Sequence, residues 1–287
     1  MRYRELLIAL RKLLASEGDR AAQIARELCA HAAGKTVEEL LRDGDNYVPD
    51  DVRVRAEGLC AESLSGRPLA YILGEWSFYG VPLTVNGDVL IPRDDTMAVT
   101  TLAEEFLRGR ENPRALDLCT GSGCIGIALA VRLPEARLTL ADVSDAALRT
   151  AKANVTRHKL TARISVVRAD ARKEPPAMLR GYDALIANPP YITSAEMETL
   201  DPSVKDYEPH LALDGGADGL EIVRAICANY ACVLKDGGAV CFEFGMGQET
   251  AVGEILEKNG FSDLQYRKDN HGVTRAVLAR KNRKELE

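Results

Sequence analysis

The sequence predicts an α/β protein in which a small helical bundle precedes a doubly wound domain. Two observations carry this prediction. After residue 113, strand-like apolar runs alternate with helical segments, which is typical of a parallel sheet with helices on both faces. Before residue 70, apolar residues recur at three- and four-residue steps, as in amphipathic helices. A chain of 287 residues is long enough for two domains.

Composition and charge exclude several classes of protein. The chain is 46% hydrophobic and 28% charged, which is ordinary globular usage. Its net charge of −6, from 37 basic and 43 acidic residues, argues against a general nucleic-acid coat, so no direct nucleic-acid substrate is expected. The N-terminus does not have the pattern of a signal peptide, and no apolar run approaches the length of a membrane span. We expect a cytoplasmic monomer that makes no membrane contact.

The cysteines and histidines do not form a recognisable framework. Seven cysteines are scattered without a C-x-x-C pair, and the four histidines are isolated from one another. Zinc sites and disulfide frameworks both need clustered residues at short spacings. The sequence therefore predicts no metal site, and it indicates buried thiols in a reducing compartment.

Four amphipathic segments are expected to form the N-terminal bundle. The second ends near Gly34, Thr36 and Glu39 have capping-box spacing at the start of the third, and the fourth runs from about residue 50 to 65. We assign residues 1–66 to this helical domain. The side chains expected to face its interior are Leu6, Leu7, Leu10, Leu13, Leu14, Ile24, Ala25, Leu28, Cys29, Ala32, Ala56, Leu59, Cys60 and Leu64.

Residues 67–93 change to an aromatic and β-branched texture with turn signals. The segments 71–74, 76–80 and 81–85 predict a β-hairpin linker between the two domains.

The third region, residues 94–287, is predicted to be the doubly wound domain. The last two expected strands are separated by the turn-rich residues 268–272, which indicates a hairpin at the edge of an otherwise parallel sheet. The expected strands are 115–119, 137–142, 164–169, 182–187, 239–244, 264–267 and 273–279.

A glycine-rich turn follows the first of these strands and predicts an adenosine-type site. Glycines at 121 and 123 allow a ligand close approach, and the following helix offers free N–H groups. Asp142 ends the second strand and is placed to accept the hydroxyls of a ribose, while Asp170 follows the third strand, near an adenine. Gly121-x-Gly123-x-x-Gly126 also satisfies the dinucleotide fingerprint, so these residues alone leave the ligand open.

A second motif, Asn188-Pro189-Pro190-Tyr191, follows the fourth strand. Because proline fixes its own φ and restricts the preceding residue, this loop is expected to be stiff. The Asn188 side-chain oxygen and the Pro189 carbonyl can accept both hydrogens of a planar –NH2 group, and Tyr191 offers a flat surface beside it. This pattern next to an adenosine site favours methyl transfer to a planar nitrogen.

With these motifs, nearly the whole chain resembles the release factor glutamine methyltransferases within the class I S-adenosylmethionine methyltransferases. The linker at 67–74 and the segment 208–216, which contains Leu-Asp-Gly-Gly, narrow the resemblance to glutamine as the acceptor. Further matching segments are 89–93, 117–126 and 188–191.

The resemblance implies a Rossmann-like seven-stranded fold and methylation of the glutamine in the Gly-Gly-Gln motif of peptide chain release factors. It implies that Asn188, Pro189 and Tyr191 act in catalysis. Pro190 and Phe78 join these three in binding the substrate, with Tyr191 and Phe78 forming the walls of its pocket. The resemblance further implies that the helical domain at 1–66 recognises the substrate. It also implies that S-adenosylmethionine is bound by Asp117, Cys119, Thr120, Gly121, Ser122, Gly123, Asp142, Asp170, Ala171 and Asn188.

The sequence departs from the family pattern at several positions. Asp94-Asp95-Thr96-Met97 stands where a Pro-(Asp/Glu)-Thr-Glu segment is usual, so a carboxylate near the methionine end of the cofactor is absent at Met97. Cys119 replaces a common glycine, and Ala171 stands where an aromatic side chain could stack on the adenine. Three other functions stay open: glutamine methylation of a ribosomal protein, N-methylation of a nucleic-acid amino group and, more distantly, nicotinamide-dependent oxidoreduction.

Overall fold

The computed structural model describes residues 1–282. The chain divides into two compact units. The first contains Met1–Gly74 and a short return segment, Pro202–Tyr207. The second contains Glu75–Asp201 and the chain from Glu208 onward. No helix within residues 1–282 is long and apolar enough to cross a bilayer.

The first unit is a helical bundle. The capping box of Thr36 and Glu39 is confirmed, and Gly34 ends the preceding helix in the left-handed conformation. Leu13 and Leu64 were expected inside but are 55% and 45% exposed, because each lies at the last residue of its helix and faces away from the buried stripe. The elements are α1 (Tyr3–Leu13), a 3-10 helix (Ala15–Arg20), α2 (Ala21–Ala33), α3 (Val37–Arg42), α4 (Asp50–Leu64), α5 (Leu69–Leu73) and α9 (Pro202–Lys205).

The linker contains the expected hairpin, but its first segment was predicted wrongly. Residues 71–73 belong to helix α5, which follows Pro68 and ends at the left-handed Gly74. The hairpin pairs β1 (Glu75–Phe78) with β2 (Val81–Thr84) through Tyr79 and Gly80. Both of these residues have positive φ, as a two-residue turn that follows the right-handed twist of the strands requires.

The second unit is built on a seven-stranded sheet with the order β5-β4-β3-β6-β7-β9-β8. The predicted edge hairpin is confirmed, because β9 runs antiparallel to both of its neighbours and the other neighbouring strands pair in parallel. The strands are β3 (Arg114–Leu118), β4 (Arg137–Asp142), β5 (Ile164–Arg168), β6 (Tyr182–Ala187), β7 (Leu234–Glu243), β8 (Phe261–Lys268) and β9 (Thr274–Lys281).

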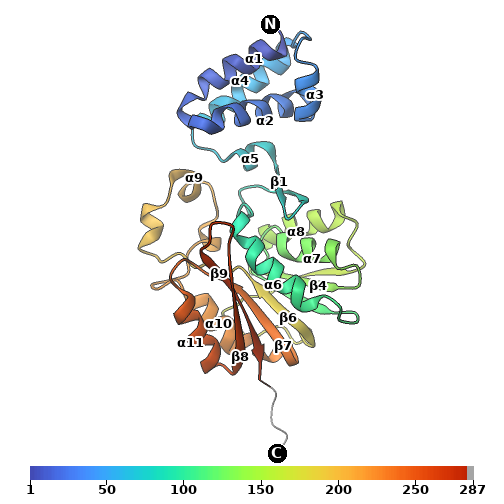
Figure 1. Ribbon diagram of the computed structural model, residues 1–287, viewed down its shortest axis with the longest axis vertical. Helices are drawn as coiled ribbons and strands as arrows, with labels where there is room; N and C mark the ends of the chain where they lie inside the picture. The colour runs from blue at the N-terminus through green and yellow to red at the C-terminus, as the bar shows by residue number, and fades with distance from the viewer. Residues whose placement is uncertain (283–287) are drawn as a thin grey trace, which may run out of the picture. The chain divides into compact units, whose positions relative to one another are not determined.

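Helices cover both faces of this sheet (Figure 1). One core cluster joins α6 (Met97–Leu107), α7 (Cys124–Arg132) and α8 (Asp145–Arg157) to the sheet, and the other joins α10 (Glu221–Tyr230) and α11 (Glu249–Lys258). Neighbouring residues of one strand divide between the two clusters, as Leu185 and Ile186 do in β6. This is why the central strands are apolar throughout instead of alternating with polar residues.

The strand order brings distant segments together at the carboxyl edge of the sheet. The strands that follow β3 in the chain, β4 and β5, lie on one side of it, whereas β6 lies on its other side. The loops after β3 and β6 therefore lead away from one another, as at the ligand sites of open α/β sheets. Leu118 pairs with Ala187, and Ala187 pairs with Phe242. The next residue along the chain in each of the adjacent strands β3, β6 and β7 is therefore Cys119, Asn188 and Glu243, respectively.

Candidate active site

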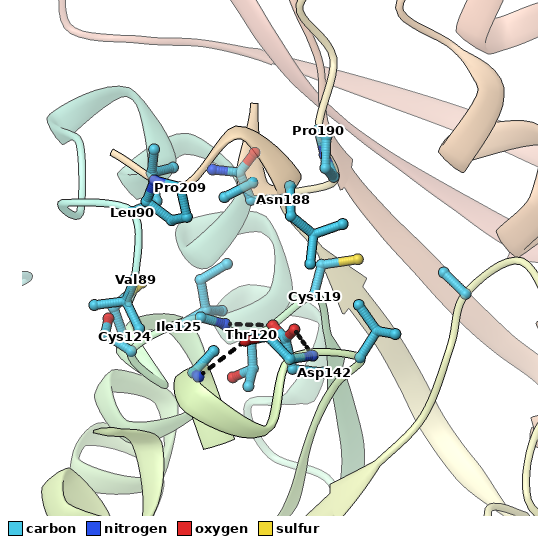
Figure 2. Close-up of a pocket in the computed structure, with 18 of the residues that line it drawn as sticks. Val89, Leu90, Cys119, Thr120, Cys124, Ile125, Asp142, Asn188, Pro190 and Pro209 are labelled. Carbon is cyan, nitrogen blue, oxygen red and sulfur yellow. Dashed lines mark hydrogen bonds between the residues drawn. The ribbon is translucent and has the colours of Figure 1, made fainter. Parts of the chain in front are cut away.

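A cavity lies at this carboxyl edge, within the second unit. It encloses about 1020 Å³ of space, a volume that includes solvent at its open mouth. Figure 2 shows Cys119 between Asp142 and the pair of Asn188 and Pro190. The cavity thus joins the two motifs that the sequence singled out. Of the predicted site residues, those that line it are Cys119, Thr120, Gly121, Ser122, Asp142, Asp170, Ala171, Asn188 and Pro190.

Asp117 holds the glycine loop from behind. Its Oδ2 accepts hydrogen bonds from the Thr120 hydroxyl at 2.6 Å and from the Gly126 backbone N–H at 2.9 Å. The side chain is fully buried, and this burial raises the pKa of Asp117 to about 7. A Cβ at position 126 would come within 2.2 Å of the Leu140 side chain, so only glycine allows this close packing of α7 against β4.

The loop itself runs through the left-handed backbone region. Cys119, Gly121 and Gly123 have φ values of 62°, 54° and 83°. The residue at 119 therefore adopts a conformation that favours glycine, although this chain has cysteine there.

Asp142 is oriented by the same loop. Its two carboxylate oxygens accept hydrogen bonds from the backbone N–H groups of Gly121 and Ser144, each at 2.9 Å. Burial raises the pKa of Asp142, although these backbone bonds lower it. A carboxylate has about four acceptor positions, so the side chain keeps capacity to accept two hydroxyl groups from a ligand in the cavity.

The segment 170–171 forms another part of the cavity wall and is anchored to α10. The hydroxyl of Tyr230 donates to the Asp170 carbonyl at 3.0 Å, and the side chain of Asn229 donates to the Ala171 carbonyl at 3.3 Å. The Asp170 carboxylate accepts from the Arg172 backbone N–H. Ala171 contributes only a methyl group here, which leaves room for a flat ring but does not stack on it.

The Asn-Pro-Pro-Tyr loop is fixed by side chains on both sides. Asn188 Nδ2 donates to Thr96 Oγ1 at 3.2 Å, and the Tyr191 hydroxyl donates to Glu243 Oε1 at 3.3 Å. Gln248 donates to the Tyr191 carbonyl at 3.0 Å and accepts from the Gly245 backbone N–H at 2.8 Å. These bonds hold the loop in one conformation.

The Leu-Asp-Gly-Gly segment packs directly on the same loop. A Cβ at Gly215 would lie 2.7 Å from the Pro190 carbonyl oxygen and 2.8 Å from Tyr191 Cα. A Cβ at Gly219 would lie 2.2 Å from the Tyr191 carbonyl oxygen. The backbone approaches so closely that these two positions must be glycine, which fixes this segment against residues 188–191, called the acceptor loop below.

Two other segments in which the sequence resembles the family, 89–93 and 208–216, contact one another. Arg93 donates to Glu208 Oε1, and the backbone N–H of Ile91 donates to Oε2 at 3.1 Å. The Glu208 side chain is buried, and Arg93 and Pro209 both line the cavity. The ion pair therefore holds the two segments together along one wall.

Five predicted site residues do not line the cavity. Asp117 lies beneath the glycine loop and Gly123 lies within it, whereas Pro189 and Tyr191 lie in the Asn-Pro-Pro-Tyr loop. Phe78 is 2% exposed and packs in the core cluster beneath α6 and α7, so the structure does not bring its ring to this cavity.

Sequence reasoning missed Thr96 and Glu243. A signal for Glu243 was present, since it is the only carboxylate in the apolar run 239–244. Burial raises the pKa of Glu243 to about 7, although the neighbouring hydroxyls of Thr96 and Tyr191 lower it. In the segment 94–97, where the sequence departs from the family pattern, Asp95 forms an ion pair with Arg275 at 3.4 Å and Met97 packs against the core.

Known proteins resemble this chain in sequence and in fold. The family model described as PrmC N-terminal domain matches residues 5–74, and the one described as Methyltransferase small domain matches residues 96–240. A methyltransferase structure from Pyrococcus furiosus has a TM-score of 0.51 at 18% identity and covers 77% of this chain and 97% of its own, which shows the shared fold.

Curated relatives cover most of the chain. A release factor glutamine methyltransferase from Geobacter sulfurreducens is 36% identical over 279 residues, 96% of each chain. Another, from Chlorobaculum tepidum, is 41% identical over 225 residues, 76% of each chain. With this identity over this length, the chain belongs to the release factor glutamine methyltransferase family.

Proposed function

We propose that this protein transfers a methyl group from S-adenosylmethionine to the side-chain amide nitrogen of the glutamine in the Gly-Gly-Gln motif of peptide chain release factors. One observation carries the proposal. The Asn188–Tyr191 loop adjoins the glycine loop through the pairing of Leu118 with Ala187, so an amide acceptor and an adenosine-type ligand are neighbours.

The cavity residues fit the cofactor. Asp142 keeps acceptor capacity for two ribose hydroxyls, and nothing lies within 4 Å of a Cβ built at Gly121, so the loop leaves open space there. Asp170 and Ala171 would flank the adenine. When bound, S-adenosylmethionine supplies a methyl group on a sulfonium, which leaves as the neutral thioether S-adenosylhomocysteine when the carbon–sulfur bond breaks.

The chain itself contributes mainly orientation. An amide nitrogen is a weak nucleophile because its lone pair is delocalised into the carbonyl. The Asn188 oxygen and the Pro189 carbonyl would accept its two hydrogens and aim the nitrogen at the methyl carbon. Orientation of this kind contributes about 7–11 kcal/mol in the best intramolecular models, and fixed dipoles add to it. The nitrogen loses one proton, for which water and the carboxylates of Asp88, Asp142 and Asp170 are the acceptors at the cavity, since its lining includes no histidine or lysine.

The proposal extends to the partner and the compartment. Class I release factors would be bound as protein substrates by a monomeric enzyme in the cytoplasm, where translation terminates. Support comes from the curated relatives, whose names specify release factors.

Mass spectrometry on a purified release factor tests the proposal. After incubation with this protein and S-adenosylmethionine, we expect one added methyl group on the glutamine of the Gly-Gly-Gln peptide. A release factor with alanine in place of that glutamine should gain none. If the intact release factor gains none either, although calorimetry shows that S-adenosylhomocysteine binds, the acceptor is a different one, and ribosomal proteins and nucleic acids become the next candidates. Binding of NAD in preference to S-adenosylhomocysteine would indicate an oxidoreductase.

A further inference from the structure

Asn154 is a fully buried polar residue in the interior of α8. Its buried neighbours on this helix include Ala151 and Val155. Asparagine is a weak helix former, and burying its amide costs free energy unless the polar atoms find partners. The hydrogen bonds of Asn154 must therefore offset both costs.

The amide of Asn154 uses its oxygen and its –NH2 group together. Oδ1 accepts from the Thr84 backbone N–H at 2.7 Å, and Nδ2 donates to the Thr84 carbonyl at 2.9 Å. Nδ2 also donates to the Ser122 carbonyl at 2.9 Å. The –NH2 group has two hydrogens, one for each carbonyl. Because all three partners are backbone groups, whose donor or acceptor character is fixed, they allow only one orientation of this amide.

These bonds connect two walls of the cavity. Ser122 belongs to the glycine loop and lines the cavity. Thr84 is the last residue of β2, and the chain reaches a second wall four residues later. Asn154 does not line the cavity, so it acts on a ligand only through these two segments. The residues of the second wall are Asp88, Val89, Leu90, Pro92 and Arg93.

The same helix also holds Asp142, the side chain proposed to bind the ribose. The Ser144 backbone N–H donates to Asp142 at 2.9 Å, and the Ser144 hydroxyl caps α8 by accepting from the Ala147 backbone N–H at 3.2 Å. One helix is therefore bonded to Asp142 at its start and, through Asn154, to both cavity walls further along.

We propose that Asn154 is a positioning residue that holds the glycine loop and the segment 88–93 in register and so shapes the cavity for S-adenosylmethionine. The proposal rests on the proposed function only in taking S-adenosylmethionine as the ligand of this cavity. It adds a residue that never touches this ligand but sets how tightly the cavity binds it.

Asn154→Leu tests the proposal because leucine has nearly the same size but no hydrogen-bonding group. We expect the affinity for S-adenosylhomocysteine, measured by calorimetry, to fall about tenfold or more, since the two walls lose their common partner. Val155→Ala is the matched control, because this buried neighbour contributes to the core and its loss lowers stability without reaching the cavity. Wild-type affinity in Asn154→Leu, or an equal loss in Val155→Ala, would assign Asn154 a packing role only and overturn the proposal.

A second control separates the two walls. Arg157 also holds the hairpin on α8, through Glu75 and the Thr84 hydroxyl, but it is exposed and does not reach the glycine loop. We expect Arg157→Ala to bind S-adenosylhomocysteine nearly as the wild type does. A loss as large as that in Asn154→Leu would show that fixing the hairpin alone is sufficient, which would overturn the role of the bond to Ser122.

Hydrogen exchange of the Thr84 backbone N–H tests the proposal in the wild type, so it does not depend on a variant that folds. Thr84 does not line the cavity. If its bond to Asn154 opens only when the cavity walls separate, S-adenosylhomocysteine should slow this exchange about tenfold or more at saturation. Exchange that is the same with and without the ligand would overturn the proposal.

None of these measurements uses a release factor. A wild type that binds S-adenosylhomocysteine but does not methylate a release factor would therefore contradict the proposed function and leave the result for Asn154 standing. Failure of the wild type to bind S-adenosylhomocysteine would overturn both.

Discussion

Arg93 donates a hydrogen bond to the buried carboxylate of Glu208, 115 residues further along the chain. The same carboxylate accepts from the backbone N–H of Ile91, so one side chain satisfies two donors from a single segment. This contact ties the residues that precede α6 to the residues that precede the Leu-Asp-Gly-Gly turn. It explains how two segments without regular secondary structure form a stable wall of the cavity.

Removing this carboxylate should destabilise the second unit. For Glu208→Ala we expect the free energy of unfolding to fall by about 3 kcal/mol, because a buried N–H and a half-buried guanidinium lose their partner. The fluorescence of Trp76, the only tryptophan, reports on this unit during urea denaturation. Glu105→Ala is the control, since its ion pair with Arg267 is exposed and should contribute less than about 1 kcal/mol. Equal losses in the two variants would show that the Glu208 contact is no stronger than a surface pair.

The backbone at Cys119 makes a second prediction. At a φ of 62° a side chain costs about 1–2 kcal/mol that glycine does not incur, and a β-branched side chain costs more. We therefore expect Cys119→Gly to retain or increase stability and Cys119→Val to decrease it, as measured by urea denaturation. A valine variant as stable as the glycine variant would show that the backbone at this position is not strained.

The close approach at Gly215 predicts an effect on turnover. In Gly215→Ala the new methyl group meets the backbone of Pro190 and Tyr191, so the acceptor loop must shift. We expect kcat to fall about tenfold or more, while the affinity for S-adenosylhomocysteine changes little, because Gly215 does not line the cavity. Gly58→Ala is the matched control, since nothing lies within 4 Å of a Cβ there. A Gly215→Ala enzyme with unchanged kcat would contradict the assignment of this contact.

Asn188→Ala separates acceptor binding from cofactor binding. Because the side chain is expected to hold the target amide, its removal should abolish turnover, while calorimetry should show nearly unchanged binding of S-adenosylhomocysteine. Loss of both to the same extent would instead make Asn188 mainly a cofactor ligand.

Glu243 should make stability depend on pH. Burial is the main cause that raises the pKa of Glu243 from 4.5 to about 7. The negative charge of Asp95 also raises this pKa, whereas the hydroxyls of Thr96 and Tyr191 and the positive charge of Arg275 lower it. Between these two values the folded state binds more protons than the unfolded state, so stability falls as pH rises from about 4.5 to 7. The full effect is on the order of 3 kcal/mol.

Glu243→Gln removes this titration, and the difference from the wild type isolates it from other groups. We expect the stability of the variant, relative to the wild type, to rise between pH 5 and pH 8 in denaturation experiments. Asp117→Asn provides a comparison, because burial also raises the pKa of Asp117, from 3.8 to about 7. For this variant, the rise in stability relative to the wild type should begin at a lower pH, near 3.8. A difference between Glu243→Gln and the wild type that does not vary with pH would contradict the raised pKa.

Local patterns in the sequence determined much of this protein. The capping box at Thr36 and Glu39, the order of strands and helices after residue 113 and the terminal hairpin all follow from residues close together in the chain. The glycine loop and the Asn-Pro-Pro-Tyr loop were predictable for the same reason, because each is set by the backbone restrictions of its own glycines or prolines.

Only the tertiary structure decided which of these residues meet. Thr96 and Asn188 lie 92 positions apart, and their side chains form a hydrogen bond because α6, which begins directly after Thr96, packs beside β6. The segment 71–73 reads as a strand from its composition, but its helix is set by Pro68 and Gly74 at its two ends. Phe78 looked like a pocket wall, but its ring packs in the core because alternation in the short β1 turns that side chain inward. Contacts of this kind depend on strand order and on burial, which no short stretch of sequence encodes.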